Sequence, residues 1–157
     1  MFIPNIPENS LKSLLEEITY IAEKLEGKKK FVFYNAATEQ EIKKLEDDLQ
    51  TKLPESYKEF LEFSNGARLC NLQALFLSTS EIIDNLEEYQ DEDEEFPDDY
   101  IIIADLIGNG EVLCFSKKTG KFISFYEDDE EEYETLNEAL VDIVKMVRDV
   151  AEEIVEL

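Results

Sequence analysis

Two dense runs of carboxylates are the residues of this chain whose type and spacing could do chemistry. The first run precedes a strongly apolar segment, and its acidic members are Asp91, Glu92, Asp93, Glu94, Glu95, Asp98 and Asp99. The second run follows a later apolar segment, and its acidic members are Glu127, Asp128, Asp129, Glu130, Glu131, Glu132 and Glu134. Carboxylates at this density attract cations, which include metal ions and the basic side chains of other proteins.

The charge of the whole chain favours a cationic protein partner. The chain has 39 Asp and Glu against 15 Lys and Arg, a formal net charge of −24. Residues 1–78 carry 13 acids and 10 bases, a net charge of −3, whereas residues 79–157 carry 26 acids and 5 bases, a net charge of −21. Concentrated like charge opposes the compact state through self-repulsion. We therefore interpret the chain as a binder of something basic, with solvated loops that serve solubility as the alternative.

Other chemistries fit the same residues less well. No segment has the calcium-loop pattern, so we expect only weak, non-specific binding of divalent cations. The chain has no histidine, which excludes Ser-His-Asp and Cys-His nucleophiles, and exposed runs do not supply the buried acid of a glycosidase. Gly108-Asn109-Gly110 leads into an apolar segment typical of a strand, so it predicts a hairpin turn rather than a phosphate loop. We expect no enzyme, no cofactor, no dedicated metal site and no nucleic-acid binding.

Helical spacing of apolar residues predicts several helices. The first covers about residues 9–26, with Asn9 or Ser10 as its cap. The pairs Thr38 with Glu41 and Ser78 with Glu81 each have capping-box spacing and each predict a helix start. A short helix is expected after Leu53, with Pro54 in its first position and Asn65-Gly66 as a left-handed C-cap. Thr135 with Glu138 predicts the start of a long final helix.

Three segments predict an antiparallel meander, which places the two acidic runs. The strands are expected at residues 100–106, 111–116 and 122–126, with a further short strand at 75–77. In a meander the first run shares one sheet end with Lys117, Lys118 and Lys121. The second run leaves from the other end, where no base in the meander offsets it. The favoured binding patch is therefore Glu127 to Glu134 with Asp105 and Glu111, and with Tyr126 and Tyr133 as aromatic anchors.

The element order predicts an α+β fold. We expect one antiparallel (mixed) sheet with helices packed mainly on one face, in a single domain over residues 1–157. Cys70 and Cys114 lack metal-like spacing and are expected to be buried thiols. The chain shows no signal peptide or apolar run long enough to cross a bilayer. We expect it to be soluble and cytoplasmic, away from membranes, and a monomer or weak homodimer.

The segment from Leu53 to Gly66 resembles the SUKH superfamily (the SMI/KNR type), which includes yeast cell-wall assembly regulators and many bacterial immunity proteins. The matching features are a Leu-Pro, a Tyr three residues later, a Phe-Leu pair and a closing Asn-Gly, which here are Leu53, Pro54, Tyr57, Phe60, Leu61, Asn65 and Gly66. Residues 101–111 and 121–127 resemble the family's strand and glycine turn and its next strand, so the resemblance covers about residues 35–150. It implies a structural role for the signature and no shared catalytic set.

The resemblance implies two functions. The first is an immunity protein that binds and neutralises a cognate toxin of a bacterial toxin system; the charge adds that the toxin is basic, with a nuclease domain as the expected case. The alternative is a regulatory or scaffolding interaction module like the yeast relatives. An acidic enzyme that uses a divalent metal is a third, weaker hypothesis.

Overall fold

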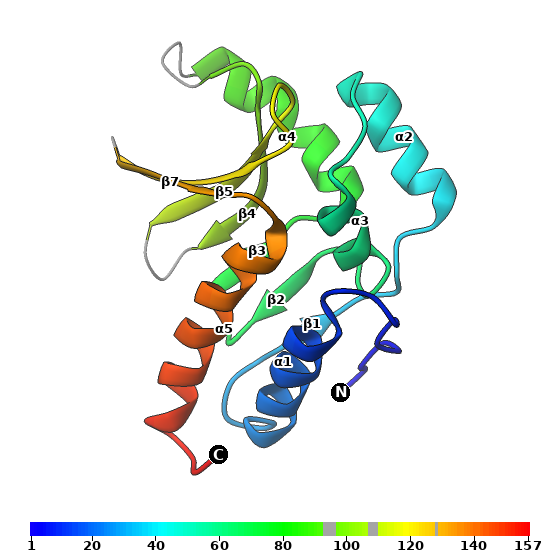
Figure 1. Cartoon of the computed structure of the whole chain (residues 1–157). Helices are drawn as coiled ribbons and strands as arrows, with labels where there is room; N and C mark the ends of the chain where they lie inside the picture. The colour runs from blue at the N-terminus through cyan, green and yellow to red at the C-terminus, as the bar shows by residue number, and fades with distance from the viewer. Residues whose placement is uncertain (93–96, 107–109, 128) are drawn as a thin grey trace.

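The chain folds into a seven-stranded sheet flanked by helices (Figure 1). The computed structural model describes residues 1–92, 97–106, 110–127 and 129–157, with side chains described outside residues 87–92. The strands are β1 (Val32–Phe33), β2 (Ala67–Leu69), β3 (Ala74–Phe76), β4 (Tyr100–Leu106), β5 (Glu111–Ser116), β6 (Phe122–Tyr126) and β7 (Asp129–Tyr133). The helices are α1 (Lys12–Lys24), α2 (Glu39–Leu49), α3 (Glu55–Leu61), α4 (Thr79–Glu92) and α5 (Leu136–Glu152).

The sheet is antiparallel throughout, and its strands lie in chain order from β1 to β7. This arrangement confirms the α+β class and the expected meander, and β4, β5 and β6 have the predicted bounds. The short β2 and the acidic β7 were not predicted. The predicted turn at Gly108 and Asn109 lies outside the described residues, as do Asp93, Glu94, Glu95 and Asp128, and the side chains of Asp91 and Glu92.

The helix α1 belongs to the core because its apolar face packs against α5 (Figure 1). Leu15, Ile18 and Ile21 are each no more than 1% exposed. On the side of this contact, Arg148 of α5 donates from Nε to Glu17 Oε1 at 2.7 Å. The helix begins at Lys12 rather than near Asn9, because the Asn9 side chain accepts from the Leu11 amide and closes a separate turn first.

Aromatic side chains of the signature segment attach α3 to the sheet. The Tyr57 ring lies 6.1 Å from the Phe115 ring of β5, and the Phe60 ring stacks on Phe76 of β3 at 4.6 Å. Leu53 and Leu61 are buried beside them. Pro54 occupies the cap position just before α3 rather than the first helical position. These contacts agree with the structural role expected for the signature.

The predicted C-cap at Asn65-Gly66 is wrong. The helix α3 ends at Leu61, because Phe63 then turns inward and packs edge-on against Phe33 at 5.4 Å. Asn65 instead joins two helix starts: its Oδ1 accepts from the Thr79 amide at 2.9 Å, and its Nδ2 donates to Glu41 at 3.1 Å. The Asn65-Gly66 pair therefore links the starts of α2 and α4 and leads directly into β2.

Both predicted capping boxes at these helix starts are present. The Thr38 and Ser78 side chains accept from the amides of Glu41 and Glu81 at 3.1 and 3.2 Å. The two glutamates accept in return from the amides of Thr38 and Ser78, each at 3.0 Å. The predicted buried thiols are also confirmed, since Cys70 and Cys114 are free and buried, and burial raises the pKa of both.

Gly66 is required for the close approach of two backbone segments, which predicts that Gly66→Ala destabilises the fold. Its φ is +90°, and a Cβ there would lie 2.9 Å from the Phe76 carbonyl oxygen and 3.0 Å from the Ser78 amide nitrogen. We expect a loss of about 2–4 kcal/mol in the free energy of unfolding, measured in urea. Gly27→Ala is the matched control, with a φ of +83° and no atom within 4 Å, and should lose about 1 kcal/mol. Equal losses would contradict the role of this contact.

Candidate functional site

The second acidic run forms a hairpin with β6 instead of a loop that leaves the sheet. The chain turns at Glu127, whose φ is +53°, and Asp129–Tyr133 then pairs antiparallel with Phe122–Tyr126. Aspartate and glutamate are depleted in strands, so their types gave no strand signal. Two features make the strand possible: its acidic side chains are exposed at the sheet edge, and Tyr133, the single aromatic residue of β7, lies opposite Phe122.

Because β7 folds back along β6, Lys121 forms ion pairs with the second acidic run. Lys121 Nζ lies 3.2 Å from Glu132 Oε1 and 3.2 Å from Glu134 Oε1. The expectation that no base in the meander offsets the second run is therefore wrong. The antiparallel pairing brings the end of β7 beside the start of β6, where Lys121 lies. At the first run, Lys118 lies 4.0 Å from Asp99, as expected for that end.

The alternation of side chains along a strand divides the acidic residues between the two faces of the sheet. Glu131 and Tyr133 lie on the face that α5 covers, together with Glu111 of β5. Asp105 pairs with Val112 and therefore lies on the opposite face from Glu111. The expected patch is thus split: Glu111 joins Glu131, whereas Asp105 is half-buried elsewhere, and burial raises its pKa.

The other predicted residues take varied positions. Glu130 and Glu132 lie on the face opposite Glu131, where the Tyr100 hydroxyl donates to Glu130 at 3.3 Å. Exposed side chains are those of Tyr126, Glu127, Asp129, Glu130, Glu131, Glu132, Glu134 and Asp98. Asp99 is half-buried and accepts from the Ser116 hydroxyl at 2.7 Å, so it has a structural partner.

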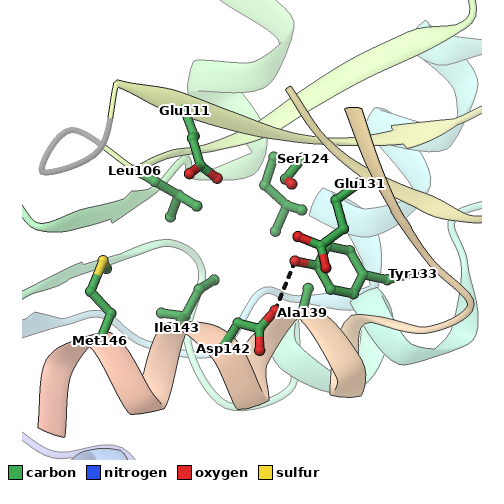
Figure 2. A pocket seen from close by; sticks show the side chains of 10 residues that line it. Leu106, Glu111, Ser124, Glu131, Tyr133, Ala139, Asp142, Ile143 and Met146 are labelled. Carbon is green, nitrogen blue, oxygen red and sulfur yellow. Dashed lines mark hydrogen bonds between the residues drawn. The ribbon is translucent and has the colours of Figure 1, made fainter. Parts of the chain in front are cut away.

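A pocket between the sheet and α5 brings three carboxylates together (Figure 2). Its volume is about 140 Å³, and its lining residues are Leu106, Glu111, Leu113, Ser124, Glu131, Tyr133, Ala139, Asp142, Ile143 and Met146. Figure 2 shows Glu111 and Glu131 directed from the strands toward the space above α5, with Asp142 on the helix below. No lysine or arginine stands among the described residues of this lining.

Asp142 was missed by reasoning from the sequence, although a signal for it exists. Ala139, Asp142, Ile143 and Met146 follow the spacing i, i+3, i+4 and i+7, which places them on one side of α5. Asp142 is therefore the acidic member of a helix side that otherwise carries apolar residues. The Tyr133 hydroxyl donates to Asp142 Oδ2 at 2.9 Å, which fixes this carboxylate at the pocket wall.

The electrostatics of the pocket favour a cation. Burial raises the pKa of Glu111, and the negative charges of Glu131 and Asp142 raise it further. Burial and the hydrogen bond to Asp142 raise the pKa of Tyr133, so this phenol stays a neutral donor. The apolar walls suit the methylene stem of a lysine or arginine, and the carboxylates suit its charged head. In the described part of the chain, no group of three or more acidic or cysteine residues is arranged to hold a metal ion.

The two tyrosines expected as anchors differ in their availability. Tyr126 is 43% exposed, and its ring lies over Gly110, where an added Cβ would come within 3.2 Å of Cε2. Tyr133 is half-buried and engaged with Asp142. Tyr126 is therefore the aromatic surface open to a partner, whereas Tyr133 shapes the pocket.

The mutual repulsion in the pocket predicts that Glu111→Gln stabilises the protein at neutral pH. The pKa of Glu111 is raised above its ordinary value of 4.5, so the folded state disfavours the charged form at any pH above the folded pKa. This penalty disappears as the pH falls through the folded pKa. We expect a gain of less than about 1 kcal/mol at pH 7, because solvent screens a half-buried group, and no gain near pH 4.

Urea unfolding at the two pH values measures this effect. Glu23→Gln is the control, because Glu23 is exposed on α1 and forms none of the ion pairs of the described residues. A Glu111→Gln protein less stable than the parent at pH 7 would contradict the repulsion.

A comparison with known protein families identifies the family of this chain. Residues 36–145 match the SMI1 / KNR4 family (SUKH-1), a segment that begins just before α2 and includes nearly all of the pocket lining. No curated protein matches the chain. Among the helices that the structure describes, none is both long and apolar enough to cross a membrane. The match covers most of the chain and confirms the resemblance seen in the signature segment, so the chain belongs to the SMI1 / KNR4 family (SUKH-1).

Proposed function

We propose that this protein is an immunity protein that binds and neutralises a cationic protein toxin. One observation carries the proposal: Glu111, Glu131 and Asp142 converge on an open pocket directly beside the exposed acidic strand β7. Membership of the SUKH-1 family supports a role in this class of interaction proteins. In this proposal the protein acts by occupying its partner's surface, without catalysis of its own.

In the free protein the carboxylates of the pocket repel one another, and a basic partner would relieve this repulsion. Burial raises the pKa of Glu111 above its ordinary value, and the two neighbouring carboxylates of Glu131 and Asp142 raise it further. A lysine or arginine head between them would replace like-charge repulsion with attraction, and its stem would cover Leu106 and Met146. Binding to the folded state alone also raises its stability by mass action.

A nuclease is the kind of toxin that this surface fits best. Enzymes that grip phosphates carry positively charged clefts, because phosphate contacts are made by lysine and arginine. A folded row of carboxylates competes for such a cleft by presenting negative charge in a fixed arrangement. Complementary charge also speeds capture, and association rate constants can reach the order of 10⁸–10⁹ M⁻¹s⁻¹ at low salt.

Electrostatic capture predicts a steep dependence of the association rate on ionic strength. Stopped-flow or surface-based kinetics with an inactivated cationic toxin candidate should show association slowed on the order of tenfold or more between low salt and about 0.5 M salt. The dissociation rate should change less, because it depends on the short-range contacts of the bound complex. An association rate indifferent to salt would contradict the proposed mode of binding.

Charge reversal predicts which acidic run meets the partner. Glu130→Lys with Glu131→Lys should slow association on the order of tenfold at low salt, because both side chains are exposed on β7. Asp91→Lys with Asp98→Lys is the matched control in the first run, with the same change in net charge, and should slow association by less than about threefold. The opposite ranking of the two pairs would refute the assignment to β7.

A further inference from the structure

The strand β7 leaves one edge of the sheet open. It is the last strand in the sheet order, and β6 pairs with only one of its sides. Backbone groups of an antiparallel edge strand point alternately toward the neighbour and outward, so every second residue of β7 offers an amide and a carbonyl away from the sheet. Among the described residues, no turn or loop backbone hydrogen bond reaches Asp129–Tyr133.

The opposite edge of the sheet differs from β7 in length and in its contacts. The strand β1 has two residues, Val32 and Phe33. The chain just before it is tied to the β2–β3 turn, since Lys30 and Asn71 exchange hydrogen bonds of 2.8 and 2.7 Å. The strand β7 has five residues and is exposed from Asp129 to Glu132. It is therefore the edge on which another strand could pair over several residues.

The charges of β7 select what can pair there. Four of its five residues are acidic, and they lie on both faces of the strand. A second copy paired through the same edge would place four carboxylates against four others, and like charges directly across strands destabilise pairing. A strand of uncharged residues would leave the repulsion among the carboxylates of β7 unchanged. A strand with lysines or arginines would place opposite charges across the new pairing, which stabilises it.

We propose that the cationic partner docks by adding a strand to the outer edge of β7. This inference rests on the proposed function and names how the same surface is used. On the α5 face, alternate basic side chains of the added strand would lie beside Asp129 and Glu131, near the mouth of the acidic pocket. On the other face they would lie beside Glu130 and Glu132. Backbone pairing would supply register, and the carboxylates would supply the preference for basic residues.

Amide hydrogen exchange with a defined peptide tests this inference. The probe is a short peptide that alternates lysine and threonine, added to the full chain at low ionic strength. The control peptide has the same sequence and charge but carries N-methyl groups on all its internal amides, so neither of its edges can donate to a neighbouring strand and it binds by charge alone. We expect the outward amides of β7 to exchange on the order of tenfold more slowly with the first peptide and at an unchanged rate with the second.

The variants and outcomes separate this inference from the proposed function. Asp129→Asn with Glu131→Gln should weaken the unmethylated peptide's affinity by about threefold to tenfold, whereas the control Glu23→Gln should leave it unchanged. Equal effects of the two peptides on β7, or no protection of β7 by either, would overturn strand addition. The proposed function would still hold in that case if a cationic toxin associates with the steep salt dependence described above, and it would fail if that dependence is absent.

Discussion

Backbone pairing between β6 and β7 holds an acidic segment extended against the repulsion of its own carboxylates. Four consecutive acidic residues occupy β7, a strand built from residue types that disfavour strands. Contacts of two side chains support the pairing at its end. Tyr133 lies opposite Phe122 and donates from its hydroxyl to Asp142, and Lys121 forms ion pairs with Glu132 and Glu134. The edge position lets the remaining charges stay in water. The candidate site exists only because this hairpin forms.

The helix α5 gives the acidic strand a rigid support. Its apolar face is buried over most of its length, including Leu140, Ile143 and Val147, and α1 covers its far side. The same helix presents Asp142 to the pocket, so one element supplies both packing and charge. A folded anion of this kind differs from a flexible acidic tail, because its carboxylates keep fixed positions before the partner arrives. Less ordering is then needed on binding, which favours affinity.

Much of the scaffold could be predicted from the sequence, because periodicity and capping residues report local structure. The capping boxes at Thr38 and Ser78 and the strands β4, β5 and β6 were predicted with close bounds. The role of Asn65 was not, since its bonds to Glu41 and Thr79 join residues distant in sequence. The signature residues carry no local sign of this junction. A left-handed glycine after a helix predicts a C-cap, and only tertiary structure shows the contact of Gly66 with β3 instead.

The candidate site was predictable in composition but not in arrangement. The carboxylates of the second run and Glu111 were identified from their density and position, and the structure brings Glu111 and Glu131 together. Asp105 was assigned to the same patch because it lies at the same sheet end, but strand alternation places it on the other face. Asp142 was missed because it lies outside both runs, on the helix α5 that follows the second run. Pairing register and helix packing decide these points, and neither is visible in a list of acidic residues.

The most direct test is the structure of this protein bound to its natural partner. The interface should contain the exposed carboxylates of β7 and the acidic pocket, with lysine or arginine side chains of the partner within ion-pair distance of Glu111, Glu131 or Asp142. An apolar contact surface elsewhere on the molecule, with these carboxylates directed into solvent, would contradict the central claim that a fixed array of negative charge is what the partner recognises.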